Sequence, residues 1–216
     1  MTGKLSVVAT PIGNLEDITL RALRVLKEAE VVACEDTRQT RKLLAHFDIH
    51  TPTSTLGHLP KLLEQGKHVA LVSDAGTPGV SDPGLELVSK AREAGATIET
   101  IPGASALTAA LAIAGLRAPT FTFYGFLPLK KGRETLFKEV VVSPRASIFY
   151  ESPHRIVKTL ETLAAHLPAG RRVGVFRELT KLYEDHIVGS ATEVLDAIKN
   201  NPDKQRGEFV VIIEGR

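Results

Sequence analysis

Residues 73–84, with the sequence SDAGTPGVSDPG, form the segment of this chain that offers the most groups able to bind a small molecule. It combines three glycines, two prolines, two carboxylates and three hydroxyl groups. Most strand-to-helix connections in α/β units have only ~2–6 residues, and glycines let the backbone approach a ligand closely. The segment therefore predicts a binding loop over residues 74–81, with Asp82 as the cap of the next helix.

A second candidate is the run Glu35, Asp36, Thr37 and Arg38. Two neighbouring carboxylates and a guanidinium can shift one another's pKa values and orient a hydroxyl group for deprotonation. The same residues also suit the first turn of a helix, where acids are favourable and Thr37 is a possible cap. From the residues alone, we favour the helix-start interpretation.

Three further motifs stand beside predicted strands. The turn at residues 9–14 has one glycine where a dinucleotide-binding loop needs three, which argues against a pyrophosphate cofactor and leaves a tight turn or a ligand-binding turn. Residues 149–155 and 176–181 each place charged and hydroxyl side chains at a strand end, and either could line a cleft. His154 and His186 have no partner at metal-ligand spacing, so we expect no metal.

Strands and helices alternate through the first half of the chain, which is the pattern that positions such loops. Strands are expected over residues 5–9, 31–34, 68–73 and 97–101, with helices that follow the caps Thr19 and Asp82, as in βαβ units with a parallel sheet. Open α/β sheets bind ligands at the carboxyl ends of their strands, where the loop and the Glu35 run both lie. An alanine-rich helix expected over residues 104–114 permits close approach of another group.

The second half of the chain has a different pattern of predicted strands and helices. Strands expected over residues 121–125, 146–150, 172–177, 186–189 and 209–213 outnumber helices, which predicts a mixed, largely antiparallel sheet. Proline, glycine and basic residues at 127–133 are typical of a crossing between domains. We therefore expect an α/β protein of two domains: a parallel-sheet domain over residues 1–120 and a mixed-sheet domain over residues 121–216.

Composition limits the class of protein. The 216 residues are 43% hydrophobic and 24% charged, as in ordinary globular domains, which excludes disordered, collagen-like and coiled-coil chains. No apolar run reaches the ~18 residues that span a bilayer, and the start does not resemble a signal peptide. The single cysteine, Cys34, suits a reducing compartment, so we expect a cytoplasmic protein with no membrane contact. A net charge of +2 does not by itself indicate a nucleic-acid partner.

Seven motifs, taken in order, resemble one known family. They are VATPIGNLEDIT (8–19), EDTR (35–38), LVSDAGTP (71–78), IPGASA (101–106), GFLP (125–128), FYES (149–152) and RELTK (177–181). In this order they resemble the bacterial small-subunit ribosomal RNA methyltransferase I family, which uses the tetrapyrrole-methylase fold. The resemblance covers nearly the whole chain. The SDAGTP and EDTR motifs separate this branch from corrin methylases and diphthine synthases.

The resemblance implies a fold, a cofactor and an activity. The fold is that of class III S-adenosylmethionine methyltransferases, with two α/β sub-domains and a cofactor cleft between them. The activity is methyl transfer from S-adenosylmethionine to the ribose 2′-hydroxyl of a cytidine in the decoding region of 16S rRNA within the 30S subunit. It implies a homodimer, and no metal is needed because the sulfonium carries its own leaving group. Carried over by position, the cofactor-binding residues are Pro11, Ile12, Asp74, Ala75, Gly76, Gly79, Val80, Ser81, Ser105, Ala106, Tyr150, Phe176 and Arg177.

Roles in catalysis and RNA binding follow from the same resemblance. We expect Glu35 or Asp36 to act as the base or orienting group, with Arg38 steering phosphate and with Glu151 and Glu178 as second choices. Basic residues expected to bind RNA are Lys130, Lys131, Arg133, Arg155 and Lys181.

This chain departs from the family at one internal loop, and two other functions remain open. Relatives carry a histidine- and acid-rich stretch after the segment that resembles residues 50–53, where this chain has only residues 54–58. One alternative function is a small-molecule methylase acting on a tetrapyrrole or corrinoid. The other is a non-catalytic S-adenosylmethionine-binding module of ribosome assembly, which the short loop favours.

Overall fold

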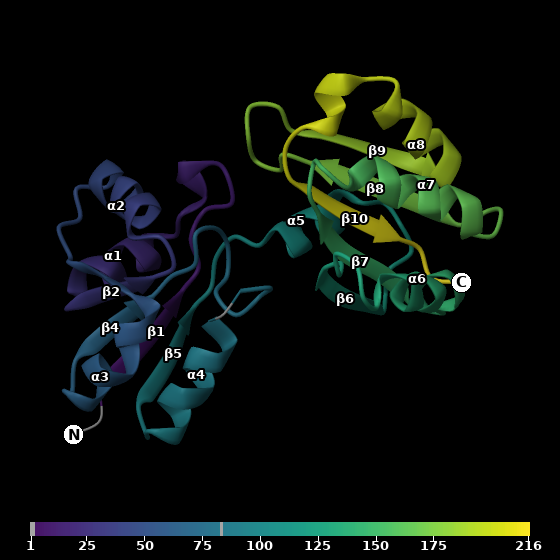
Figure 1. The fold of residues 1–216 in the computed structure, drawn as a ribbon. Coiled ribbons are helices and arrows are strands. Elements are labelled where there is room, and N and C mark those ends of the chain that lie inside the picture. The colour runs from purple at the N-terminus through teal and green to yellow at the C-terminus, as the bar shows by residue number, and fades with distance from the viewer. Residues whose placement is uncertain (1–2, 83) are drawn as a thin grey trace. The chain divides into compact units, whose positions relative to one another are not determined.

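The computed structural model describes residues 3–82 and 84–216, which divide into two compact units at Ser105 and Ala106 (Figure 1). The division falls before helix α5 (Ala106–Ile113), whereas the change in the pattern of predicted strands and helices places it near residue 120. The physical reason is that α5 packs against strand β10 (Phe209–Ile213), so this helix belongs with the second unit.

The first unit is a five-stranded parallel sheet, as predicted. Its strand order is β3-β2-β4-β1-β5, with β1 at Lys4–Val8, β2 at Val31–Cys34, β3 at Thr53–Thr55, β4 at His68–Leu71 and β5 at Thr97–Ile101. Strand β1 lies between β4 and β5 and pairs with both, so that Leu5 lies between Val69 and Ile98 in this register. The buried, aliphatic strands are typical of a parallel sheet covered on both faces.

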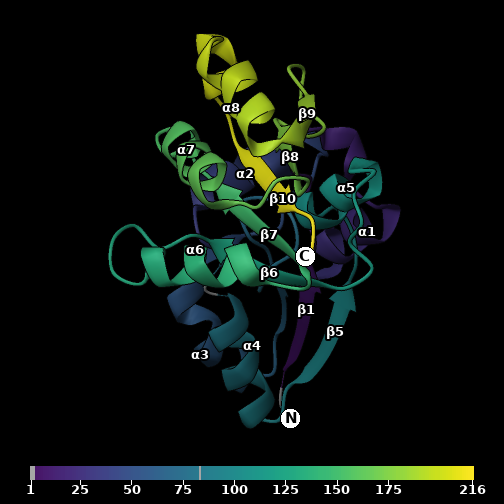
Figure 2. The ribbon, with the colours of Figure 1, turned by 90° about the vertical axis from the view of Figure 1, so that its right-hand side faces the viewer.

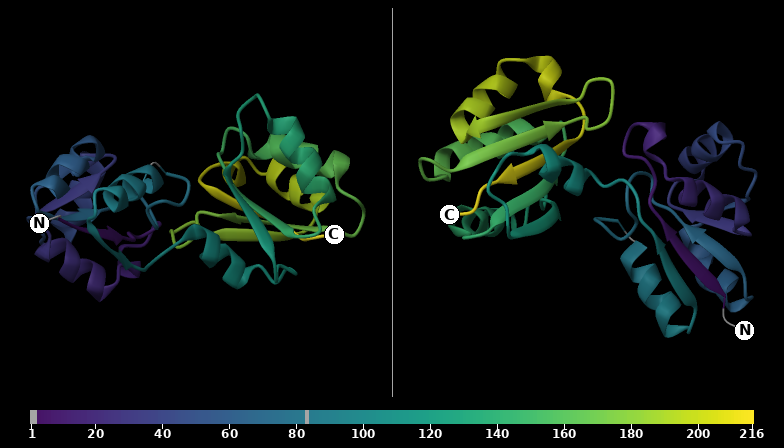
Figure 3. Two further views of the ribbon diagram at one scale, coloured as in Figure 1. Left: turned by 90° about the horizontal axis from the view of Figure 1, so that it is seen from below. Right: turned by 180° about the vertical axis from the view of Figure 1, so that it is seen from behind.

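Helices cover both faces of this sheet. Helices α1 (Leu20–Glu28) and α2 (Thr37–His46) pack on one face in a core that includes Leu26, Val32 and Leu44. Helices α3 (Leu59–Glu64) and α4 (Gly84–Glu93) pack on the other, in a core with Leu5, Leu63 and Ala91, and Figure 3 shows α4 beside β5. The short helices η1 (Leu15–Asp17) and η2 (Leu56–His58) lie in the connections.

The second unit has the mixed sheet that the sequence predicts. The order is β6-β7-β10-β8-β9, with β6 at Phe121–Phe126, β7 at Ala146–Glu151, β8 at Arg172–Arg177 and β9 at Asp185–Ser190. Only the β6–β7 pair is parallel among the pairs of this sheet in the described residues; β7, β10, β8 and β9 pair antiparallel.

One face of this second sheet carries the larger core. Helices α6 (Arg133–Val142), α7 (Ile156–His166) and α8 (Ala191–Lys199) contribute Phe137, Leu160 and Val194 to it, and η3 (Pro202–Gln205) follows α8. Figure 2 shows α7 and α8 side by side. None of the helices in the described residues is long and apolar enough to cross a membrane.

Some boundaries differ from the sequence prediction. Helix α5 begins at Ala106 rather than at residue 104. The prediction contains neither β3 nor α6. Residues 133–142 form a regular helix although residues 127–133 suggest a crossing between domains. The predicted proline at the start of α4, Pro83, lies outside the described residues.

Candidate functional site

At the carboxyl edge of the first sheet, a short backbone bridge joins the loop after β1 to the loop after β4. We call this bridge between Thr10 and Gly76 the clasp. Thr10, directly after β1, forms an isolated antiparallel bridge with Gly76, with N–H to O distances of 2.9 and 3.1 Å. The buried Thr10 hydroxyl also donates to the carbonyl oxygens of Ser73 and Gly76, at 3.3 and 3.4 Å. The loop after β4 is therefore fixed to the turn after β1, which contains the predicted cofactor residues Pro11 and Ile12.

The predicted binding loop has a backbone that requires glycine at two points. Gly76 and Gly79 have φ angles of 79° and 87°, and Ser81 has a φ of 66°. Asp82 stabilises this loop conformation, because its carboxylate accepts hydrogen bonds from the N–H groups of Gly79 at 2.9 Å and Gly84 at 2.7 Å. The predicted capping role of Asp82 thus includes a bond back into the loop.

The loop after β5 joins the same edge. The Thr77 hydroxyl donates to the carbonyl oxygen of Ala104 at 3.1 Å. A Cβ added to Gly103 would lie 3.0 Å from Ala9 Cβ, so this position needs glycine where two loops approach closely. A Cβ added to Gly76 would lie 3.3 Å from Ile12 Cγ2, which places Ile12 beside the clasp.

These loops leave polar groups and backbone open at one edge of the sheet. Asp74, Ala75 and Ser81 are exposed, Gly79 and Val80 are half-buried, and Gly103 is exposed beside them. The exposed groups are a carboxylate, a hydroxyl group and glycine backbone, which are groups that bind polar ligands. Among the described residues, no cluster of three or more His, Cys, Asp or Glu side chains could hold a metal ion.

Asp36 and Arg38 form a local pair at the start of α2. The Asp36 carboxylate accepts from the backbone N–H of Arg38 at 2.8 Å and from its guanidinium at 2.9 and 3.2 Å. These hydrogen bonds from Arg38 lower the pKa of Asp36 to about 2. The cap of α2 is Asp36 rather than Thr37, so the helix-start interpretation explains Asp36 but assigns the cap one residue too late.

Glu35 differs from its neighbour. Glu35 is exposed by surface area at the end of β2, but partial desolvation there, together with the negative charges of Asp82 and Asp74, raises its pKa. The backbone N–H of Asp36 donates to Asp74 at 3.2 Å, which fixes the Glu35 segment to the predicted binding loop. Of the two acids, Glu35 therefore has the properties of a base, because a carboxylate with a raised pKa is the stronger proton acceptor.

The remaining predicted cofactor residues lie in or next to the second unit. Ser105 ends the first unit and Ala106 begins α5. The Tyr150 ring makes edge contacts with Phe123 and Phe126, with centroid distances of 5.0 and 5.4 Å.

Phe176 and Arg177 end β8, and their side chains have different environments. Phe176 is fully buried, and its ring stacks on that of His186. The Arg177 guanidinium donates to the carbonyl oxygens of Arg206 at 2.6 Å and Tyr183 at 3.1 Å, which fixes the side chain to two neighbouring loops.

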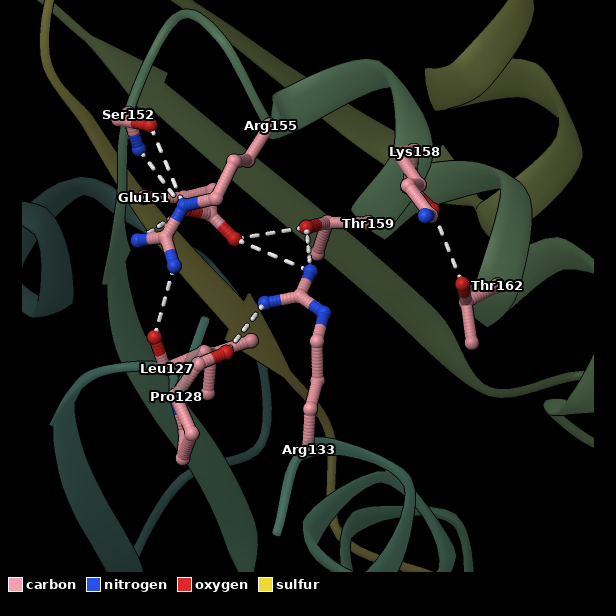
Figure 4. A network of polar contacts seen from close by, with 9 residues as sticks. All are labelled: Leu127, Pro128, Arg133, Glu151, Ser152, Arg155, Lys158, Thr159 and Thr162. Carbon is pink, nitrogen blue, oxygen red and sulfur yellow. Dashed lines mark hydrogen bonds and ion pairs between the residues drawn. The ribbon is translucent and has the colours of Figure 1, made fainter. Parts of the chain in front are cut away.

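Two arginines expected to bind RNA are paired with a buried acid (Figure 4). The Glu151 side chain is fully buried and lies 2.7 Å from the guanidinium of Arg155 and 3.4 Å from that of Arg133. Those guanidinium side chains are only 19% and 14% exposed. Arg133 and Arg155 are therefore structural partners of Glu151, and Glu151 is not a free carboxylate for catalysis.

Lys181 and Glu178 are also paired. Lys181 Nζ lies 2.8 Å from Glu178 and 2.9 Å from Glu208. Burial alone would raise the pKa of Glu178, but the ion pair with Lys181 and the hydrogen bond from the N–H of Glu208 outweigh it and lower the pKa. Lys130 and Lys131 are exposed, and of the basic residues expected to bind RNA they are the two for which the structure describes no ion pair.

Sequence reasoning missed three residues of this arrangement. Thr10 and Gly103 fix the loops after β1 and β5, and Thr159 hydrogen-bonds Glu151. Thr10 and Gly103 lie inside the motifs of the resemblance, so their place next to strand ends is the signal that could have found them. Nothing in the sequence marks Thr159, a single threonine on α7.

Two α/β units, with a glycine-bearing loop at the carboxyl edge of the first sheet, form the architecture that the sequence resemblance implies. A family model described as Tetrapyrrole (Corrin/Porphyrin) Methylases matches residues 4–195. The chain therefore belongs to the tetrapyrrole methylase family, and the predicted family and fold are confirmed.

Its similar curated relatives carry one name. Proteins named ribosomal RNA small subunit methyltransferase I are 47% identical in Halalkalibacterium halodurans and 44% identical in Escherichia coli O157:H7, with 99% of this chain and 76% and 78% of the relatives covered. The corresponding protein of a Hydrogenobaculum species is 42% identical, with 97% and 95% covered. The first alignment runs over 223 positions against 216 residues here, so that relative has extra residues inside the matched region.

Solved structures support the fold alone. The chain matches the crystal structure of the methyltransferase CobJ with a TM-score of 0.72 and 21% identity, covering 99% of this chain and 95% of that one. It matches CbiF, a cobalt precorrin-4 methyltransferase, with a TM-score of 0.71 and 19% identity, covering 98% and 94%.

Proposed function

We propose that this protein transfers a methyl group from S-adenosylmethionine to the 2′-hydroxyl of a cytidine ribose in the decoding region of 16S rRNA. The observation that carries the proposal is 47% identity, over 99% of the chain, to a protein named ribosomal RNA small subunit methyltransferase I. Fold similarity alone would equally allow a corrinoid substrate, as the names of the structural matches indicate.

The cofactor is held, in this proposal, by the loops at the carboxyl edge of the first sheet. Asp74 offers a carboxylate to the ammonium or ribose hydroxyl groups, and the loop at residues 75–81 offers backbone groups. Pro11 and Ile12 cover one side next to the clasp between Thr10 and Gly76. When bound, the cofactor supplies an electrophilic methyl group on sulfur. Tyr150 and Arg177 of the second unit stay predicted contacts.

Glu35 is the proposed base. The ribose 2′-hydroxyl must lose its proton as its oxygen forms the new bond to carbon, and the carboxylate of Glu35 accepts that proton. The raised pKa of Glu35, caused by burial and the charges of Asp82 and Asp74, makes it a better acceptor than Asp36. Asp36 caps α2 and pairs with Arg38, and asparagine can also fill the capping role.

The alternatives differ in substrate and in turnover. A tetrapyrrole or corrinoid methylase would share the cofactor loops and is supported by the two structural matches. A non-catalytic binding module of ribosome assembly would keep cofactor and ribosome binding without methyl transfer. The relative from H. halodurans has residues in the matched region that this chain lacks, which agrees with a loss of methyl transfer in this chain.

Tritium transfer from labelled S-adenosylmethionine separates these functions. We expect label in 16S rRNA when 30S subunits are the acceptor and none with a corrinoid acceptor. Label only with the corrinoid would favour the second function, and cofactor binding without any transfer would favour the third. Asp74→Ala should weaken cofactor binding by about tenfold, since a charged hydrogen bond contributes ~1.5–3 kcal/mol, whereas Asp17→Ala, an exposed acid in η1, should not.

Two further properties remain proposals: a homodimer, from the family resemblance, and a cytoplasmic location, from the composition. A homodimer predicts a mass in sedimentation equilibrium of twice the 23.3 kDa of the chain. A cytoplasmic location predicts that the native protein fractionates with ribosomes rather than with membranes.

A further inference from the structure

Four residues between Pro128 and Arg133 form a loop whose two ends are tied to one buried carboxylate. The loop, residues 129–132, is followed by α6, and the carboxylate is that of Glu151 at the end of β7. Glu151 is 1% exposed, and its oxygens also accept from the N–H of Ser152 at 2.9 Å and from the hydroxyl of Thr159 at 2.7 Å. Every side of this carboxylate thus has a donor, as a buried charge requires.

Arg155 connects Glu151 to the start of the loop (Figure 4). One nitrogen of its guanidinium lies 2.7 Å from Glu151, and another donates to the carbonyl oxygen of Leu127 at 2.8 Å. Because the guanidinium is planar and rigid, these two contacts fix the direction of the backbone as it leaves β6.

Arg133 connects Glu151 to the end of the loop. Its guanidinium lies 3.4 Å from Glu151, donates to the hydroxyl of Thr159 at 2.6 Å and reaches back to the carbonyl oxygen of Pro128 at 3.2 Å. The group also lies over the ring of Phe137, 5.0 Å from its centre. The loop is therefore closed on itself through one side chain.

The closed loop presents two cations to solvent. Lys130 and Lys131 are exposed, Leu129 is 78% exposed, and residues 127–133 contain no acid. At the ends of the loop, two arginines share one carboxylate, which leaves one further positive charge. Anchoring lowers the conformational entropy that the two lysines lose on binding a polyanion.

We propose that Arg133, Glu151, Arg155 and Thr159 are positioning residues that hold Lys130 and Lys131 as a contact for phosphates of the ribosomal RNA. The inference rests on the proposed function for its partner, since it names a part of the surface that would meet that RNA. It also reassigns the two arginines from direct contacts to residues that act through the lysines.

A double-mutant cycle tests whether the arginine acts through the lysines. The probe is the affinity of the full chain for 30S subunits, measured by sedimentation at several salt concentrations. We expect Lys130→Ala with Lys131→Ala to weaken binding about tenfold and to reduce the salt slope by about 1.5, because each phosphate contact contributes ~0.7–0.9. Lys61→Ala, an exposed lysine on α3, is the control and should change neither value.

Arg155→Met should weaken 30S binding about fivefold in the natural chain but less than twofold in the double-lysine variant, since coupled residues do not add. Arg155→Lys keeps the charge beside Glu151 but cannot also reach Leu127, so it should fold and still lose part of the affinity. Equal effects of Arg155→Met in both backgrounds, or full 30S affinity in Arg155→Lys, would overturn the inference.

The same samples separate this inference from the proposed function. A natural chain that binds 30S subunits but transfers no methyl group removes the proposed activity, while the binding cycle still decides the role of Arg155. A natural chain that does not bind 30S subunits contradicts both.

Discussion

Replacing Glu151 with glutamine removes the one negative charge between Arg133 and Arg155. The variant keeps the shape of the side chain and an oxygen that can accept from Ser152 or Thr159. It leaves two guanidinium groups, 14% and 19% exposed, without a counter-charge. The loss is therefore electrostatic rather than a packing defect.

The expected loss of stability follows from the burial of this group. Removing one partner of a buried ion pair costs about 3–5 kcal/mol, because the charge left behind is desolvated. The partial exposure of both arginines lets water reach them, so we expect the lower part of this range, about 3 kcal/mol. For a unit of this size that corresponds to a fall in melting temperature of roughly 10–15 °C.

Tyrosine fluorescence measures this effect on the correct unit. The chain has three tyrosines and no tryptophan, and all three tyrosines lie beyond residue 105, so the signal reports unfolding of the second unit. Urea unfolding of Glu151→Gln should show the loss, whereas Glu161→Gln, which breaks an exposed pair with Lys199, should leave the midpoint unchanged. A loss below about 1 kcal/mol for Glu151→Gln would refute the reasoning, since it would mean that water replaces the carboxylate at little cost.

Three other predictions concern the first unit. Asp36, with a pKa of about 2 against an ordinary 3.8, contributes stability that is present above pH 3.8 and lost as the pH falls toward 2. In acid unfolding followed by circular dichroism, the natural chain should therefore be more stable than Asp36→Asn at neutral pH, and the difference should vanish at low pH. The single-turnover rate should rise as Glu35 loses its proton, with a midpoint above the ordinary range of glutamate, and Glu35→Gln should lose this step. Asp82→Ala removes the hydrogen bonds to the N–H groups of Gly79 and Gly84 and should weaken S-adenosylmethionine binding, measured by calorimetry, by about tenfold. An unchanged affinity would show that the loop conformation held by Asp82 is not needed for binding.

Local signals in the sequence were sufficient for most of the fold. Thr19 caps α1 as predicted, accepting from the N–H of Ala22 at 3.0 Å, and the strands at 31–34, 172–177 and 209–213 match their predicted bounds. The strand β3 is only three residues long and half-buried, so it lacks an apolar signature. Helix α6 follows Gly132, whose φ of 86° starts it without a side-chain cap, and its N-terminus therefore resembles a loop in sequence.

The candidate site was less predictable, because pairing depends on side chains far apart in the sequence. Arg155 is an exposed cation in any one-dimensional view, yet its partner carbonyl at Leu127 lies 28 positions earlier. From the sequence motif alone, Glu35 and Asp36 are equally good candidates for the catalytic base. Only the hydrogen bonds of Arg38 to Asp36 and the charges of Asp74 and Asp82 near Glu35 distinguish the two.

The central claim is that this chain methylates small-subunit rRNA with Glu35 as the base. The most direct measurement is single-turnover transfer of labelled methyl to 30S subunits, followed by digestion of the rRNA to nucleosides. We expect the label in 2′-O-methylcytidine, with the rate lowered by about 10²–10⁴-fold in Glu35→Gln, the range for loss of a general base, and close to that of the natural chain in Asp36→Asn. Label in a base rather than a ribose, or an undiminished rate in Glu35→Gln, would contradict the account.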